Sequence, residues 1–159
     1  MALSREHIVE AADGIYAAMQ ARAYSTETWT AHALHPQEKN AATADFIFTM
    51  DLLNFCFWSE LGAAERFTVE YRGERWTGYW SLVALLQRAL DEGIPITCPY
   101  FYSDPQICDD ALLAHVFRSA TAEPVPLLAE RIACLREAGR VLCDVPHPPP
   151  APTLRLAEI

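Results

Sequence analysis

Two histidines three positions apart are the side chains whose types and spacing point most directly to chemistry. They are His32 and His35, within residues 29–36, WTAHALHP. Residues at this spacing share one face of a helix, where imidazoles can bind a metal ion, transfer a proton or hydrogen-bond a ligand. A metal centre needs further ligands close by. The sequence offers none near this pair, so we expect neither a metal nor a cofactor.

The two histidines differ in their surroundings. His35 precedes Pro36 and is expected to be a surface or capping residue. His32 has apolar neighbours and stands shortly before the most apolar stretch of the chain. It is either a pocket residue that contacts a ligand or a core histidine with internal hydrogen bonds. Both interpretations remain open at the level of the sequence.

Three further polar residues stand inside that apolar stretch, residues 45–58, DFIFTMDLLNFCFW. Its apolar positions keep close to helical spacing and fill both sides, which predicts a helix buried nearly all round and the most buried element of the fold. Thr49, Asp51 and Asn54 would then lie in the interior, where an unsatisfied polar group costs about 1–3 kcal/mol. Each is expected to have an internal partner or a ligand. Asp51 is the candidate acid, and support of the fold is its expected role.

Aromatic residues form a third group that could serve a binding site. They can stack around a flat heterocycle, although aromatic side chains in such numbers more often fill the core. Glycine-rich phosphate loops, HExxH metal sites and GxSxG nucleophile turns do not occur in the sequence, so no motif of those kinds assigns a chemistry. The aromatic set consists of Trp58, Trp76, Tyr79, Trp80, Tyr100, Phe101 and Tyr102.

Composition narrows the classes of partner. The 159-residue chain has a formal net charge of −9 at pH 7 and a hydrophobic fraction of 52%, as expected for about one globular domain. An acidic surface disfavours broad contact with nucleic acid phosphates, so we expect no direct nucleic acid partner. No run is long enough to span a bilayer and no signal peptide is recognised, which predicts a cytoplasmic protein without a membrane partner. The five cysteines fit no zinc or disulfide spacing and are expected to be reduced.

The periodicity of apolar residues predicts a mainly α-helical chain with one small β-hairpin. The hairpin pairs residues 67–71 with residues 75–78 around an Arg72-Gly73 turn, in which Gly73 takes a positive φ. A short helical turn is expected to stop before Pro36. Helices are expected at residues 5–23, 45–58, 79–92, 104–119 and 127–142, the last interrupted at Gly139.

Prolines mark two segments that should not be helical. Residues 94–102 contain two prolines and are expected to be extended. Residues 146–152 read PHPPPAP, which predicts an extended or disordered tail. The expected organisation is therefore one domain over residues 1–144 and a proline-rich tail over residues 145–159.

The order and spacing of several segments resemble the queuosine salvage protein family, over roughly residues 5–144. Members of this family are queuosine 5′-phosphate N-glycosylase/hydrolases that release the base queuine for reuse in tRNA modification. The resemblance implies a helical architecture similar to that of DNA glycosylases and a small-molecule nucleotide, queuosine 5′-phosphate, as the ligand. The segments are TMDLLNFCFWSE (49–60), YRG (71–73), GYWSL (78–82), RALDEGIPIT (88–97), VPLLAER (125–131) and LREAGRVL (135–142).

The same resemblance assigns one residue to substrate binding. Residues 29–36 are similar to the family's Trp…His-Glu-Leu-Asn-Pro segment, whose histidine contacts the substrate, and His32 is its counterpart. The chain departs from that pattern at Ala33 and His35, and it has one residue fewer between Trp29 and the histidine. The imidazole itself is retained.

The resemblance covers only the N-terminal half of the family's length. The second half carries an Asp-Tyr-Arg-x-Pro-Gln segment and the catalytic aspartate, and nothing in residues 145–159 resembles either. We therefore expect a truncated glycosylase domain with no catalytic residue of its own, and a missing C-terminal half as a partner. The alternative is a non-catalytic binding or interaction module of the same fold. A DNA glycosylase is disfavoured by the acidic charge.

Overall fold

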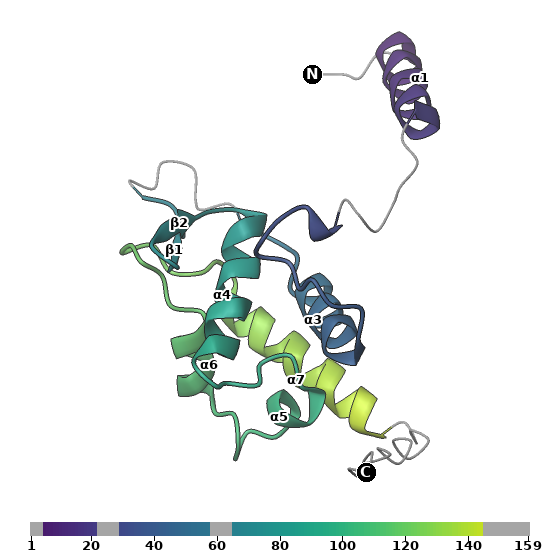
Figure 1. The fold of residues 1–159 in the computed structure, drawn as a ribbon. Helices are drawn as coiled ribbons and strands as arrows, with labels where there is room; N and C mark the ends of the chain where they lie inside the picture. Colours follow the sequence, from purple (N-terminus) through teal and green to yellow (C-terminus); the bar gives the residue numbers. More distant parts are fainter. Residues whose placement is uncertain (1–4, 22–28, 58–64, 145–159) are drawn as a thin grey trace, which may run out of the picture. The chain divides into compact units, whose positions relative to one another are not determined.

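The computed structural model describes residues 5–21, 29–57 and 65–144, which are mainly α-helical with one two-stranded hairpin (Figure 1). The mixture of elements predicted from the sequence is thereby confirmed. The chain divides into two compact units, residues 1–37 and residues 38–159. Trp58 and the proline-rich residues 145–159 lie outside the described residues.

The first unit contains helix α1, Arg5–Ala21, close to the predicted bounds. Its apolar residues recur at helical spacing, yet Ile15 and Tyr16 are 63% and 65% exposed. Residues 29–30 are helical and are followed by turns as far as residue 35. The short helical turn predicted before Pro36 is therefore present.

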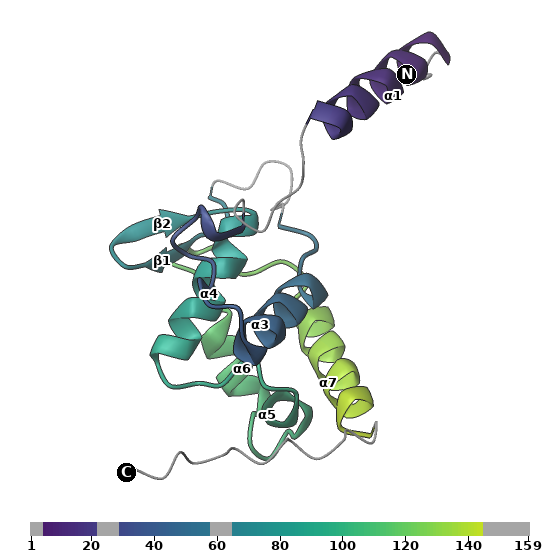
Figure 2. The same ribbon diagram turned by 45° about the vertical axis from the view of Figure 1, so that its right-hand side comes forward.

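Helix α4, Tyr79–Asp91, lies at the centre of the second unit. Packed against it are the hairpin, helix α3 (Ala41–Leu52) and helix α6 (Asp110–Val116), as Figures 1 and 2 show. Most of α4 is buried, including an unbroken run from Ser81 to Leu86, and no other described helix is buried to this extent. The sequence predicted this role for residues 45–58, and that prediction is wrong.

Helix α3 is shorter and less buried than predicted. Asn40 caps its start by accepting a hydrogen bond from the Thr43 amide at 3.0 Å, and the helix ends at Leu52 rather than near Trp58. Phe46 is buried, whereas Phe48 is 41% exposed. Although the stretch is apolar on all sides, its neighbours among the described elements are α4 and α7. Only the side facing them is buried.

The predicted hairpin and its turn are confirmed, but the paired strands are shorter than the predicted residues 67–71 and 75–78. Strand β1 (Val69–Tyr71) pairs antiparallel with β2 (Glu74–Trp76), with Tyr71 opposite Glu74. Both turn residues have positive φ, 53° at Arg72 and 78° at Gly73, and this combination matches the twist of the flanking strands. Strand β1 alternates buried, exposed and buried positions, so its period of two reflects burial against α4.

Two predictions for the segment after α4 are wrong. Residues 94–102 are not extended throughout, because Pro99–Ser103 forms the short helix α5, and proline is compatible with the first helical position. Residues 104–119 do not form one helix. The Asp104 carboxylate accepts a hydrogen bond from the Gln106 amide at 2.8 Å and closes a turn, and α6 begins only after a second capping residue, Asp109.

Helix α7, Leu128–Asp144, is continuous through Gly139, where an interruption was predicted. A Cβ atom on Gly139 would lie 2.8 Å from Ser103 Cβ and 2.9 Å from the Tyr102 ring. The glycine therefore permits the close approach of α5 to α7 rather than breaking the helix. In both views α7 lies beside α3 and α5 (Figures 1 and 2). No helix among the described residues is long and apolar enough to cross a membrane.

Candidate functional site

Residues 29–36 form a tightly bonded segment around a ring pair. The Trp29 indole stacks on the His35 imidazole, with centroids 3.7 Å apart and planes within 2°. Trp29 Nε1 donates to the Pro36 carbonyl at 3.1 Å, and His35 Nδ1 lies 2.9 Å from the Trp29 carbonyl. His35 is only 8% exposed, so the surface role predicted for it is wrong. The stack with Trp29 is the physical reason.

His35 is held in a setting that favours the neutral ring. Burial lowers its pKa from the usual 6.5, against the raising effect of the hydrogen bond to the Trp29 carbonyl, and the neighbouring His32 adds to the lowering. Since the Trp29 carbonyl can only accept, the His35 Nδ1 carries the proton. His35 therefore serves as a rigid part of the segment.

His32 is half-buried beside this pair, with its ring centroid 6.1 Å from that of His35. The Leu34 amide donates to His32 Nδ1 at 3.2 Å, which leaves the proton of the neutral ring on Nε2. The His32 carbonyl accepts hydrogen bonds from the backbone of His35 and the side chain of Gln37. Both the ring and the backbone of His32 are thus held by hydrogen bonds within the segment. No set of three potential metal ligands gathers within the described ranges.

Asp51 and Asn54 are exposed, so the prediction that both face the protein interior is wrong. The buried stripe of α3 follows Phe46, Thr49, Met50 and Leu53, at the spacing of one helical face. Asp51 lies about 100° from Met50 around the helix axis, and Asn54 follows the end of the helix. The phase of the stripe therefore turns Asp51 outward, whereas Asn54 is exposed beyond the helix.

Thr49 is fully buried, as predicted. Its hydroxyl lies near that of Tyr102, which is also buried, and neither makes a hydrogen bond of good geometry to a described group. Burial raises the pKa of Tyr102 to about 12, with a smaller opposing effect from the Thr49 hydroxyl. This polar pair belongs to the packing of α3 and presents nothing to a ligand.

Only part of the predicted aromatic set comes together. Trp76 at the end of β2 and Tyr79 and Trp80 at the start of α4 are half-buried, and the Trp80 ring lies 6.5 Å from Trp76 and 5.0 Å from Tyr79. The Tyr79 hydroxyl donates to Met50 Sδ at 3.0 Å. Burial raises the Tyr79 pKa, and the charge of Asp51 adds to this. In contrast, Tyr102 is a core residue and Tyr100 is 62% exposed.

Arg131 is the residue that sequence reasoning missed. It is fully buried on α7 and donates to four backbone carbonyls: Nε to Pro126 at 2.9 Å, Nη1 to Leu53 at 2.7 Å, and Nη2 to Phe55 at 2.5 Å and to Cys56 at 3.0 Å. Its guanidinium carbon also lies 4.6 Å from the centroid of the Phe55 ring. One signal was available, because Arg131 occupies a position in the apolar stripe of α7 that also contains Leu135. We call Arg131 with these four carbonyls the Arg131 clamp.

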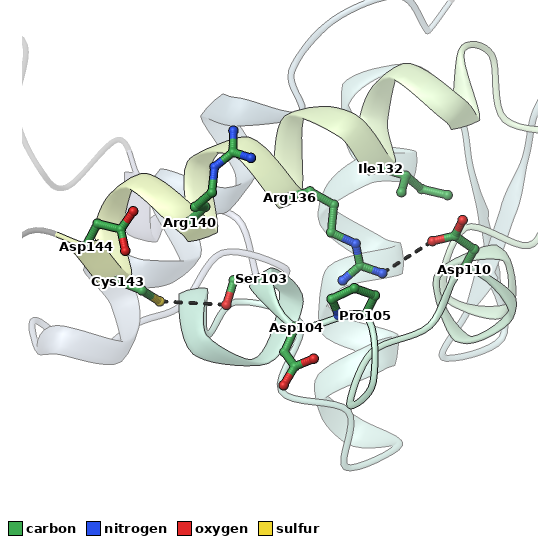
Figure 3. Close-up of a pocket in the computed structure, with 9 residues that line it drawn as sticks. All are labelled: Ser103, Asp104, Pro105, Asp110, Ile132, Arg136, Arg140, Cys143 and Asp144. Atoms are coloured by element: carbon green, nitrogen blue, oxygen red, sulfur yellow. Dashed lines mark hydrogen bonds and ion pairs between the residues drawn. The ribbon is translucent and has the colours of Figure 1, made fainter.

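A cavity of about 680 Å³ lies between α7 and residues 103–110 (Figure 3). Arg136 points across it, but its guanidinium is occupied by the carbonyls of Tyr102 and Cys108 and by the Asp110 carboxylate. At the other end, Ser103 Oγ lies 3.7 Å from Cys143 Sγ. The polar groups that face the cavity are mostly bonded to one another, so it is a weaker candidate than the His32 segment.

Known proteins are similar to this chain over most of its length. Residues 34–148 match the family model described as "Queuosine salvage protein". Among curated relatives, proteins named queuosine 5′-phosphate N-glycosylase/hydrolase are 50% identical over 125 residues in Schizosaccharomyces pombe and 42% identical over 144 residues in Nematostella vectensis. These matches cover 75% and 91% of this chain. They cover 36% and 40% of the relatives, so the chain spans well under half of their length.

Proposed function

Because this chain belongs to the queuosine salvage protein family, we propose that it takes part in hydrolysing the N-glycosidic bond of queuosine 5′-phosphate, which releases queuine for reuse in tRNA modification. The likeness to relatives of that name over most of the chain carries the proposal. The helical architecture is proposed to be similar to that of DNA glycosylases. The ligand is a small nucleotide rather than a nucleic acid, in keeping with the net charge of −9.

His32 is the proposed substrate-binding residue. Its Nδ1 accepts from the Leu34 amide, which fixes the orientation of the ring. The stacked rings of Trp29 and His35 hold together the segment of residues 29–36 that contains His32. A ring held in place before binding loses little conformational freedom when it meets a ligand. This arrangement suits hydrogen bonding to a nucleotide.

Hydrolysis of the glycosidic bond places further demands on the site. A sugar cation resembling an oxocarbenium ion must be stabilised by a carboxylate, and a water must be positioned to attack it. Asp51, the first candidate for that carboxylate, is exposed at the end of α3. We therefore assign no catalytic residue to this chain and propose that it contributes binding, with the sugar cation stabilised elsewhere in the complete enzyme.

A non-catalytic binding module of the same fold is the second candidate. The exposure of Asp51 favours it, because an exposed carboxylate is screened by water and stabilises a developing cation poorly. The two candidates share the substrate, and both predict binding without turnover by this chain alone. A pair of measurements on the purified chain tests that shared expectation against a chain that is an enzyme by itself.

The test combines isothermal titration calorimetry with queuosine 5′-phosphate and a queuine-release assay read by mass spectrometry. We expect binding, and release no faster than in a buffer blank. Release well above the blank would show that the chain is an enzyme by itself, and Asp51→Asn would then be the first variant to assay. Absence of binding would refute the proposed function of this chain.

A further inference from the structure

The Arg131 clamp fixes a segment that has no regular structure of its own. Residues 53–57 follow the end of α3, and the local backbone hydrogen bond within them is that from the Phe55 amide to the Leu53 carbonyl, at 2.9 Å. Three of their carbonyls accept hydrogen bonds from Arg131, which is 75 to 78 residues away in sequence. Residues 53–57 are therefore tied to helix α7 by three hydrogen bonds.

This arrangement has an energetic cost. A guanidinium taken out of water loses several kcal/mol of hydration, and no described carboxylate bonds to Arg131. The backbone of Cys56 has a φ of 47°, a left-handed conformation that is unfavourable for a residue other than glycine. An apolar side chain could fill the same space without burying a charge. Such costs persist where a defined backbone geometry is required.

The clamp presents one polar side chain outward. Asn54 is exposed between the fully buried Leu53 and the half-buried Phe55. Its backbone N–H donates to the Asp51 carbonyl at 3.2 Å. Its carboxamide offers a donor and an acceptor side by side. Because the carbonyls on both sides of Asn54 are bonded to Arg131, the backbone that carries this carboxamide is rigid.

We propose that Arg131 is a positioning residue for residues 53–57, and that Asn54 hydrogen-bonds the heterocyclic base of the substrate. The inference rests on the proposed function and adds to it a specificity residue and the residue that holds its backbone. A carboxamide pairs well with a heterocycle edge that carries a donor next to an acceptor. A backbone that is fixed before binding lowers the entropy lost when the side chain it carries meets a ligand.

The first test removes the carboxamide. Asn54→Ala alters an exposed side chain, so the thermal midpoint should remain within about 1–2 °C of the unmodified chain. The dissociation constants of queuine and of queuosine 5′-phosphate, measured by calorimetry, should both rise about tenfold. Equal losses for the two ligands are expected because Asn54 is assigned to the base, which both contain.

The second test removes the clamp while keeping its charge. In Arg131→Lys the ammonium cannot reach carbonyls in four directions at once, so the Phe55 amide should exchange hydrogen for deuterium at least about tenfold faster. Queuine binding should weaken to a similar degree. The matched control is Arg140→Lys, because Arg140 is an exposed arginine on the same helix and has no part in the clamp. It should change neither quantity.

A double variant separates positioning from general stability. If Arg131 acts through Asn54, then Arg131→Lys should cost no further affinity in the Asn54→Ala background. Additive losses would overturn the positioning role. Unchanged queuine binding in Asn54→Ala would overturn the assignment of Asn54 and leave the proposed function standing, since the unmodified chain would still bind. If the unmodified chain binds neither ligand, the proposed function fails and this inference fails with it.

Discussion

The Trp29 indole lies parallel to the His35 imidazole, at a centroid distance of 3.7 Å, and the Trp29 carbonyl hydrogen-bonds the same imidazole at 2.9 Å. One residue thus holds His35 through both its ring and its backbone. The adjacent His32 has its own Nδ1 satisfied by the Leu34 amide. The segment is therefore ordered by short-range contacts before any ligand arrives.

The first prediction concerns pH. We expect His35 to titrate below pH 6.5, because burial lowers its pKa more than the Trp29 carbonyl raises it. Above pH 6.5 its contribution to the free energy of unfolding is complete, and it is lost as the pH falls through the lower pKa of the folded state, since the unfolded chain binds the proton first. An NMR titration of the imidazole Hε1 resonance measures the midpoint.

A matched variant checks the same prediction. His35→Phe keeps a ring on Trp29 but cannot titrate, so the thermal midpoint of this variant should depend less on pH between 6.5 and 5. An identical pH dependence in both proteins, or an NMR midpoint above 6.5, would contradict the assignment.

The second prediction concerns the contact between α5 and α7. Gly139→Ala places a Cβ 2.8 Å from Ser103 Cβ and 2.9 Å from the Tyr102 ring, so the two helices must separate. We expect the free energy of unfolding to fall by about 1–3 kcal/mol, measured by urea denaturation. Gly14→Ala is the control, because a Cβ there meets nothing within 4 Å and alanine favours a helix. Equal stability of the two variants would refute the close approach.

The third prediction concerns the hairpin turn. Gly73 has a φ of 78°, a conformation that a β-branched residue adopts only under strain. Gly73→Val should therefore lower the free energy of unfolding by about 1 kcal/mol or more. Gly73→Asn should retain most of the stability, because asparagine tolerates this region. If the valine and asparagine variants unfold at the same urea concentration, the positive φ does not matter to the fold.

The fourth prediction concerns His32. Loss of one hydrogen bond to the substrate should weaken binding of queuosine 5′-phosphate by about 1–3 kcal/mol in His32→Ala, measured by calorimetry. His115→Ala serves as the control, since His115 is an exposed histidine on α6 that pairs with Glu92. Unchanged affinity in the His32 variant would remove this residue from the site.

Local sequence patterns determined the elements whose boundaries depend on neighbouring residues. The hairpin follows from a period of two around Arg72 and Gly73, both of which take the positive φ that the turn requires. Helix α4 starts at Tyr79, and Gly93, with a φ of 78°, lies just beyond its end. These outcomes need no information from distant parts of the chain, because steric limits on φ and ψ act within a few residues.

Tertiary contacts determine the features for which predictions from local patterns were wrong. Beyond the end of helix α3, three carbonyls of residues 53–57 accept hydrogen bonds from Arg131, which lies on a helix far along the sequence. Gly139 continues a helix because α5 packs against it. Asp51 is exposed because only one side of α3 has described neighbours. Apolar periodicity indicates which residues favour burial. Which side of an apolar helix is buried depends on where its neighbours pack, and those neighbours are brought there by contacts between distant parts of the chain.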